Sequence, residues 1–176
     1  MPEIDPKPIN ANATADDSAS VARAYFEAIA KRDLEAMVAC WAPGGIADIQ
    51  GIAKLRIPGG YREWFGNLFS AFPDFRFEIL DLIGEGELAA VRWRATGTFN
   101  GQVRFRGLEP NGARIDLSGC DMLTIRGGKI QRNEAYINGA QMAQQLGALP
   151  PLDSFPERAM TAALNLKTRA ARRLGR

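Results

Sequence analysis

The hydrophobic pattern of the chain changes its period near residue 73. Before that point apolar residues recur every three or four positions, which is typical of amphipathic helices. We expect helices over residues 17–31, 34–41 and 58–71, with an irregular, glycine-rich segment at 46–60. The third helix carries an apolar stripe that we expect to pack against a sheet: Tyr61, Trp64, Phe65, Leu68 and Phe69.

Beyond residue 73, apolar and polar residues alternate, as they do in strands that are buried on one face. The expected strands span residues 75–83, 88–99, 103–107, 113–125 and 129–137, with a short helix at 139–146. Turn signals such as Asn100-Gly101 and Gly127-Gly128 separate them. Helices followed by a run of hairpins predict an α+β fold, in which a curved antiparallel sheet packs on three N-terminal helices.

The chain divides by composition into three parts. Residues 1–16 hold three prolines and little that can be buried, so we expect a mobile leader. Residues 17–151 form one domain, and residues 152–176 form a basic helical extension. A basic helix can bind nucleic acid or an anionic membrane. Because its apolar face is thin and no aromatic residue lies among its basic ones, we expect neither partner for this extension.

Composition narrows the setting and the chemistry. A hydrophobic content of 46% and a charged content of 24% are typical of soluble globular proteins. No apolar run reaches the length of a membrane span, and the first residues lack a signal-peptide pattern, so we expect a cytoplasmic protein. Cys40 and Cys120 stand in unrelated contexts and are expected to be buried free thiols.

The sequence contains no histidine. This excludes Ser-His-Asp and Cys-His nucleophiles and the common zinc and iron sites that use imidazole ligands. Acid–base chemistry must therefore come from Asp, Glu, Tyr, Lys or bound water. We expect neither a metal nor an organic cofactor.

One acid stands out on the strand at 113–125. If side chains alternate there, one face carries only apolar residues and glycine apart from Asp121. A desolvated carboxyl has a raised pKa and can hold a proton near neutral pH. The alternative is that a bulge turns Asp121 to solvent, or that an arginine or a backbone N–H satisfies it.

The hairpin after this strand has two possible registers. A three-residue loop with a glycine bulge pairs Ile125 with Lys129 and places Asp121 opposite Asn133. A two-residue loop places Asp121 opposite Glu134, where two acids would raise one pKa by repulsion. Either register puts a polar pair beside an apolar cavity.

Several stretches together resemble the nuclear transport factor 2-like superfamily. They are AYFEAIAKRDLEAMVACWAP near the start, a glycine-rich loop, a helix ending in FPD, and a closing meander, GGKI followed by YINGAQMAQQLGALP. The closing stretch is most similar to SnoaL-like polyketide cyclases. The resemblance implies a cone-shaped pocket, a homodimer and a small-molecule substrate. It also implies an aspartate and a histidine on the last strand and an acid at the final helix, where this sequence has Ala135, Asn133 and Asn138.

A second resemblance is to ketosteroid isomerase. That family carries a tyrosine on the first helix, a base aspartate after the second helix and a protonated aspartate on the strand before the last hairpin. The positions that match in this sequence are Tyr25, Asp48 and Asp121. The resemblance implies that Tyr25 and Asp121 donate hydrogen bonds to an enolate oxygen while Asp48 moves the proton.

Two functions follow as hypotheses. The first is an isomerase- or lyase-class enzyme that performs aldol cyclisation or isomerisation on an apolar polyketide- or steroid-like carbonyl compound. Asp121, Asp48 and Tyr25 are its expected catalytic residues. The second is a binding protein of the same fold that has lost the cyclase aspartate. The expected substrate-binding residues are Trp41, Trp64, Phe65, Phe69, Trp93, Leu123, Asn133 and Ala135.

Overall fold

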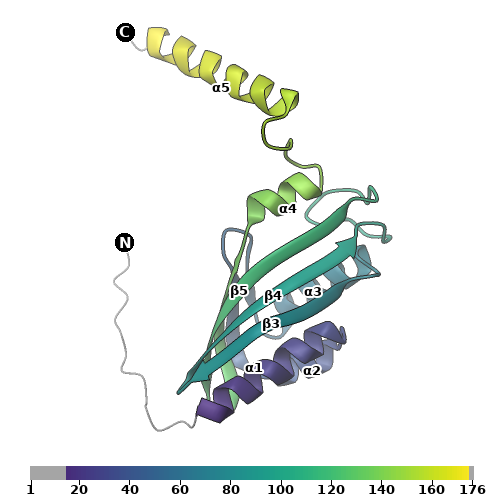
Figure 1. Ribbon diagram of the computed structural model, residues 1–176, viewed down its shortest axis with the longest axis vertical. Helices are drawn as coiled ribbons and strands as arrows, with labels where there is room; N and C mark the ends of the chain where they lie inside the picture. The colour runs from purple at the N-terminus through teal and green to yellow at the C-terminus, as the bar shows by residue number, and fades with distance from the viewer. Residues whose placement is uncertain (1–14, 175–176) are drawn as a thin grey trace.

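The computed structural model describes residues 15–174, which form one six-stranded sheet and the helices that accompany it (Figure 1). The strands are β1 Trp41–Ile49, β2 Ala53–Arg56, β3 Arg76–Glu85, β4 Leu88–Thr98, β5 Arg114–Arg126 and β6 Lys129–Ile137. The helices are α1 Ala15–Ala30, α2 Leu34–Ala39, α3 Gly59–Ala71, α4 Gly139–Gln145 and α5 Phe155–Leu174. The predicted α+β class is confirmed.

The sheet is mixed and unclosed, with the order β2-β1-β6-β5-β4-β3. Strands β3 to β6 form the expected antiparallel meander, but β1 pairs with β6 in parallel. The expectation of a purely antiparallel sheet is therefore wrong at this edge. Tight hairpins force neighbouring strands to run antiparallel, and no tight hairpin joins β1 to β6.

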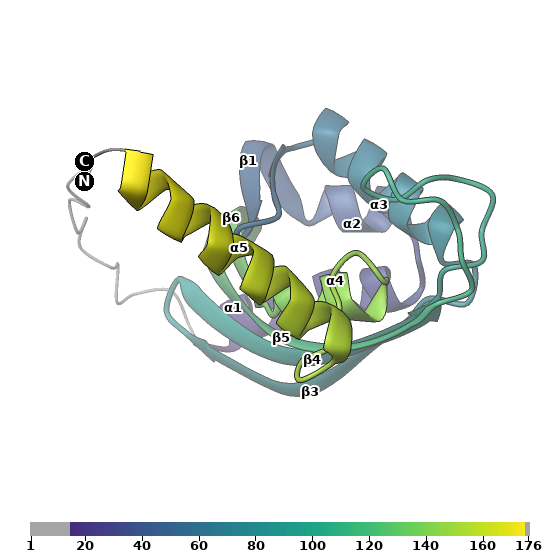
Figure 2. The same ribbon diagram turned by 90° about the horizontal axis from the view of Figure 1, so that it is seen from above.

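The three N-terminal helices cover the inner, concave face of the sheet, as Figure 2 shows for α1, α2 and α3 above the curved wall of β3, β4 and β5. The start of α2 follows its capping residue: the Asp33 carboxylate accepts a hydrogen bond from the Ala36 backbone N–H at 3.0 Å. Tyr25, Phe26 and Met37 are fully buried between the helices and the sheet. The aromatic stripe of α3 packs on this inner side, as expected.

Three local predictions are wrong. Residues 46–60 are not irregular, because they contain part of β1 and all of β2. Trp41 begins β1 and does not continue the helix before it. Residues 103–107 form no strand, since Phe105 and Leu108 pair across a tight turn. In each case the segment is short, and pairing with a neighbouring strand or turn geometry outweighs the local pattern.

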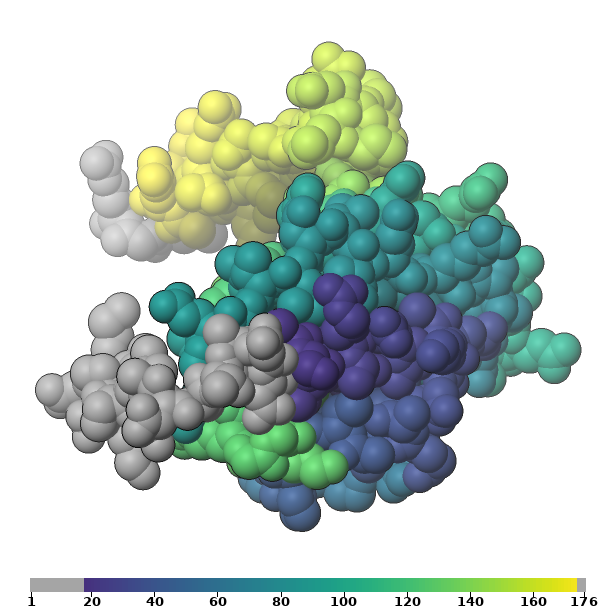
Figure 3. Space-filling view, turned by 60° about the horizontal axis from the view of Figure 1, so that its bottom comes forward, coloured from purple at the N-terminus to yellow at the C-terminus, as the bar shows by residue number. Residues whose placement is uncertain are grey.

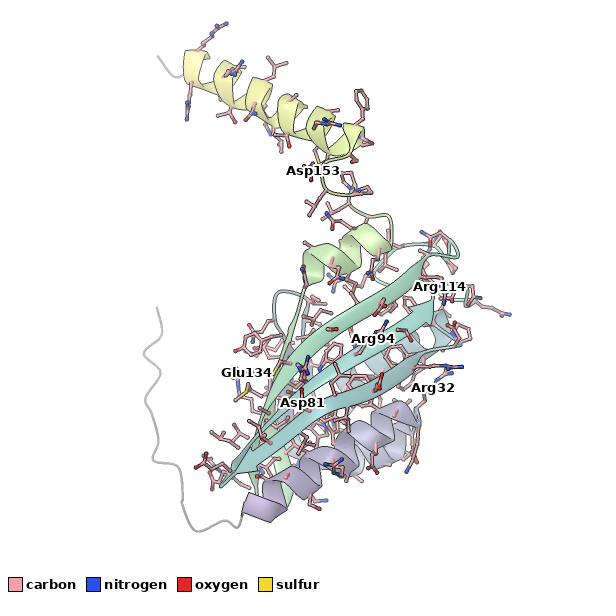
Figure 4. The ribbon with its side chains drawn as sticks, viewed as in Figure 1. Arg32, Asp81, Arg94, Arg114, Glu134 and Asp153 are labelled. Atoms are coloured by element: carbon pink, nitrogen blue, oxygen red, sulfur yellow. The ribbon has the colours of Figure 1, made fainter. Side chains whose placement is uncertain are left out.

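The outer face of the sheet carries charged pairs and a few exposed apolar residues. Figure 4 labels Asp81 and Arg94 on this face. Ile83, Met122 and Tyr136 are exposed. The expected homodimer stays a prediction. Both cysteines are free thiols, as expected, but each is only partly buried.

The two ends of the chain differ. The predicted leader lies outside the described residues except for its last two positions, which belong to α1. The C-terminal helix α5 projects away from the body of the domain (Figures 1 and 3) and exposes Phe155, Leu164 and Leu166. In the described part of the chain no helix has both the length and the apolar character needed to cross a membrane.

Candidate functional site

A cavity of about 120 Å³ lies between the inner face of the sheet and helices α1 and α3. That volume is enough for several water molecules or part of a small organic ligand. Its wall is almost entirely apolar, and its aromatic members are Tyr25, Phe26, Tyr61, Trp64, Phe65, Phe72, Phe75, Phe77, Trp93 and Phe105. The side chains in its wall that carry oxygen atoms are Tyr25, Tyr61, Asp121 and Asn133.

Asp121 points into this cavity from the middle of β5 and is only 5% exposed. Its Oδ1 accepts a hydrogen bond from Trp93 Nε1 at 2.7 Å, and its Oδ2 accepts one from Asn133 Nδ2 at 2.5 Å. Burial raises the pKa of Asp121 from 3.8 to about 6, and the two hydrogen bonds oppose that rise. The inward orientation predicted from the alternation of β5 is therefore confirmed.

The hairpin adopts neither of the two expected registers. The turn has two residues, with Arg126 opposite Lys129, but an extra residue, Gln131, is inserted in β6 before the pairing resumes. Asp121 consequently lies opposite Ala135, and Asn133 lies opposite Leu123. Asn133 reaches the Asp121 carboxylate diagonally, which is within range for neighbouring positions on one face of a sheet.

A glycine makes room for the Trp93 indole. Trp93 on β4 lies opposite Gly119 on β5. A Cβ atom at position 119 would lie 2.3 Å from Cζ2 of the indole, a distance that real contacts exclude. The bare backbone at Gly119 therefore lets the indole lie across β5 and donate to Asp121.

Two tyrosines form a hydroxyl pair in the cavity wall. The Tyr25 and Tyr61 hydroxyl oxygens lie 2.7 Å apart, and both side chains are almost completely buried. Burial raises the pKa of both phenols well above their usual range, so both stay protonated. The nearby Asp121 charge raises both pKa values further, while the Asn133 side chain lowers that of Tyr25. The tyrosine pair and the Asp121–Asn133 pair thus form one polar patch.

Asn133 has an unused acceptor. Its Oδ1 atom is buried and accepts no hydrogen bond within the described residues, whereas its Nδ2 donates to Asp121. An unsatisfied buried acceptor costs about 1–3 kcal/mol. A ligand hydroxyl or a reoriented phenol in the cavity would remove that cost.

The structure brings together most of the predicted substrate-binding residues. Trp64, Phe65, Trp93, Asn133 and Ala135 line the cavity. The others are buried in the core but absent from the cavity wall: Trp41, which packs edge-on against Tyr25; Phe69, which packs against Phe65 and Phe75; and Leu123.

Asp48 does not lie in the cavity wall. Its neighbours Ala47 and Ile49 line the cavity from β1, so strand alternation turns Asp48 to the other face. There its carboxylate lies 3.5 Å from Arg132 and 3.9 Å from Lys54. The placement expected from ketosteroid isomerase is therefore wrong, because residues 46–49 pair as a strand where an irregular loop was expected.

Tyr61 was not among the predicted site residues. The sequence groups it with the apolar stripe of α3, where it was expected only to pack. The available signal was its hydroxyl, because a buried tyrosine usually has a hydrogen-bond partner. Only the fold shows that the partner is Tyr25.

Comparison with known families agrees with this architecture. Residues 22–133 match the model of the SnoaL-like domain, so the chain belongs to the SnoaL-like family. The predicted resemblance is confirmed. A search of curated proteins finds no match.

Solved structures share the fold. AclR from Streptomyces galilaeus, described as a candidate hydroxylase, is 20% identical with a TM-score of 0.68, covering 93% of this chain and 99% of its own. A candidate SnoaL-like polyketide cyclase from Jannaschia sp. CCS1 is 18% identical with a TM-score of 0.68, covering 84% and 100%. A candidate ketosteroid isomerase from Kribbella flavida is 18% identical with a TM-score of 0.55, covering 72% and 81%. At these identities the likeness concerns the fold.

Proposed function

We propose that the cavity is the active site of a cofactor-independent enzyme that removes a proton from the carbon next to a carbonyl group. Aldol cyclisation and isomerisation of an unsaturated ketone both begin with this step. The substrate is an apolar ring compound of the polyketide or steroid kind. The observation that carries the proposal is the isolated acid, Asp121, at the polar patch of an otherwise apolar cavity.

Asp121 is the proposed general base. With a pKa of about 6 it is mostly ionised at neutral pH, yet it is far more basic than an exposed aspartate. Each carboxylate oxygen accepts one hydrogen bond from Trp93 or Asn133, which leaves further lone pairs for a proton from the substrate. The two donors also fix the orientation of the carboxylate.

The tyrosine pair is the proposed oxyanion donor. Because Tyr25 and Tyr61 share one hydrogen bond, one of their two protons remains for the oxygen of the substrate. Their raised pKa values keep both protons in place over the whole working pH range. A donor that is already oriented stabilises an enolate oxygen without reorganisation during the reaction.

The proposed base replaces the family aspartate from the neighbouring strand. The cyclase resemblance places that aspartate at residue 135, which is alanine here. Asp121 lies directly opposite Ala135 in the β5–β6 pairing and faces the same cavity. The carboxylate is therefore kept at nearly the same depth, although it comes from β5.

The test follows deuterium exchange at the α-carbons of 2-tetralone in D₂O by NMR. The protein should accelerate exchange, and the rate should rise with pH to a plateau above about pH 6 as Asp121 ionises. Asp121→Asn should lower the enzymatic rate by about 10²- to 10⁴-fold. Asp116→Asn, on the outer face of the same strand, is the matched control and should leave the rate unchanged.

Equal exchange by wild-type and Asp121→Asn protein would contradict the proposal. So would bound tetralone whose α-protons exchange no faster than those of the free ketone. That second result would favour the alternative function, a small-molecule-binding protein. Asn138 supports this alternative, because its side chain caps α4 by accepting from the Gln141 N–H at 3.0 Å. It therefore has a structural use where a cyclase would carry an acid.

A further inference from the structure

The wall of the cavity is formed in part by a tight turn between β4 and β5. Phe105 and Leu108 exchange two backbone hydrogen bonds, of 3.1 and 3.0 Å, across Arg106 and Gly107. Both central residues have positive φ angles, 50° and 83°, as a type I′ turn requires. Phe105 is buried in the cavity wall, so the turn holds Arg106 at the adjoining surface.

Arg106 lies across two residues of the cavity wall. Its guanidinium donates to the Ile52 carbonyl oxygen at 2.9 Å and lies 5.9 Å from the centre of the Trp64 ring. Ile52 and Trp64 are only half-buried and Arg106 is exposed, so the cavity wall meets solvent here, and we call this part the mouth of the cavity. Within residues 15–174 no carboxylate forms an ion pair with Arg106, whereas Arg104 on the same loop pairs with Glu109. Arg106 therefore keeps free N–H donors toward solvent.

The cavity has a negative charge at its buried end and a positive charge at its mouth. Its wall contains no lysine or arginine, and its one acid, Asp121, is buried far more deeply than Arg106. An anionic group placed beside Asp121 would face a like charge without a cation, and it would lose its water of hydration. The same group left at the mouth would meet the Arg106 guanidinium, which recognises carboxylate and phosphate groups well.

We propose that the cavity binds a ring compound whose buried part is uncharged and whose anionic group stays at the mouth beside Arg106. This inference rests on the proposed function only in taking the cavity as the substrate site. It adds a direction of entry and a requirement on the charge of the substrate.

Three ligands with one ring system test the charge order. They are naphthalene-2,6-dicarboxylate, its monomethyl ester and its dimethyl ester, and their affinities are measured by isothermal titration calorimetry at pH 7.5. The monoester should bind best. The diester should bind about two- to fivefold more weakly, because it lacks the exposed ion pair. The dicarboxylate should bind at least about tenfold more weakly than the monoester, because one carboxylate must lie near Asp121.

Substitutions at Arg106 and Asp121 test which residue causes each difference in affinity between the three ligands. Arg106→Gln should remove the advantage of the monoester over the diester, and Arg106→Lys should keep most of it. Arg104→Gln is the matched control and should change neither affinity, because Arg104 pairs with Glu109. Asp121→Asn should reduce the penalty on the dicarboxylate, measured relative to the diester in the same variant, by about tenfold.

Several results would overturn the inference. They are a dicarboxylate that binds as tightly as the monoester, an Arg106→Gln variant that weakens both esters equally, and a monoester that does not bind at millimolar concentration. These results concern binding alone. The proposed function fails separately, through proton exchange that does not depend on Asp121.

Discussion

Asp116 and Asp121 lie on the same strand, yet they are in opposite electrostatic situations. Asp116 faces solvent on the outer side of β5, and Arg94 holds it with two hydrogen bonds of 2.7 and 2.5 Å. Those bonds lower the pKa of Asp116. Asp121 faces the cavity and accepts only from neutral donors, Trp93 and Asn133, and burial raises its pKa to about 6.

The difference comes from position along the strand and not from residue type. Even-numbered residues of β5 such as Asp116 point outward, while odd-numbered ones such as Asp121 point inward. A cation stabilises the ionised form, whereas neutral donors orient a carboxylate and leave it basic. The inner acid is therefore suited to proton transfer, and the outer one is suited to the surface.

The largest expected effect is on the pH dependence of stability. The pKa of Asp121 is higher in the folded state, about 6, than its ordinary value of 3.8. Folding is therefore penalised progressively as pH rises from about 4 to 6, and the full penalty of about 3 kcal/mol remains above pH 6. Asp121→Asn should remove this penalty. Urea unfolding of the wild-type and Asp121→Asn proteins at pH 4 and pH 7.5 measures the penalty. If the unfolding free energy changes between the two pH values by the same amount in both proteins, the prediction is contradicted.

A smaller effect is expected from the donor to Asp121. Trp93→Phe removes the Nε1–H that donates to Oδ1 and keeps most of the aromatic packing. Because that bond favours the ionised carboxylate, the pKa of Asp121 should rise above 6, by about one unit. Carboxyl NMR assigned with Asp121→Asn measures the shift. A pKa that stays in place or falls would show that the indole does not act on the carboxylate.

The smallest effect is expected at the outer acid, with the opposite sign. Arg94 lowers the folded-state pKa of Asp116, so its contribution to stability is present above the ordinary pKa and is lost as pH falls through the folded value. Asp116→Asn should slightly lower the free energy of unfolding at neutral pH and should leave it unchanged in strong acid. High salt should reduce the effect, because the pair is exposed. If Asp116→Asn instead raised the stability at neutral pH, the opposite signs expected for Asp116 and Asp121 would be contradicted.

The sequence could predict features that depend on a strong local period. The alternation of β5 predicted that Asp121 points inward, and the helices and the last four long strands are near their expected positions. The predicted placement of Asp48 was wrong because Pro43 and two glycines interrupt the first half of β1. The alternating stretch that remains is too short to recognise as a strand.

Other features needed the three-dimensional fold. The extra residue Gln131 sets the register that joins Asn133 to Asp121, and a bulge has no reliable signal in a single sequence. The Tyr25–Tyr61 pair joins two helices that are distant along the chain. No local pattern encodes such a contact.

The close approach of Trp93 to Gly119 has a consequence for evolution. A side chain at position 119 would occupy the space of the indole, so the two positions are not free to change independently. Among relatives we expect them to covary: a larger residue at the position of Gly119 should accompany the loss of tryptophan at the position of Trp93. Lineages that took that path would also have lost a donor to the acid, and with it one means of setting the acidity of the cavity.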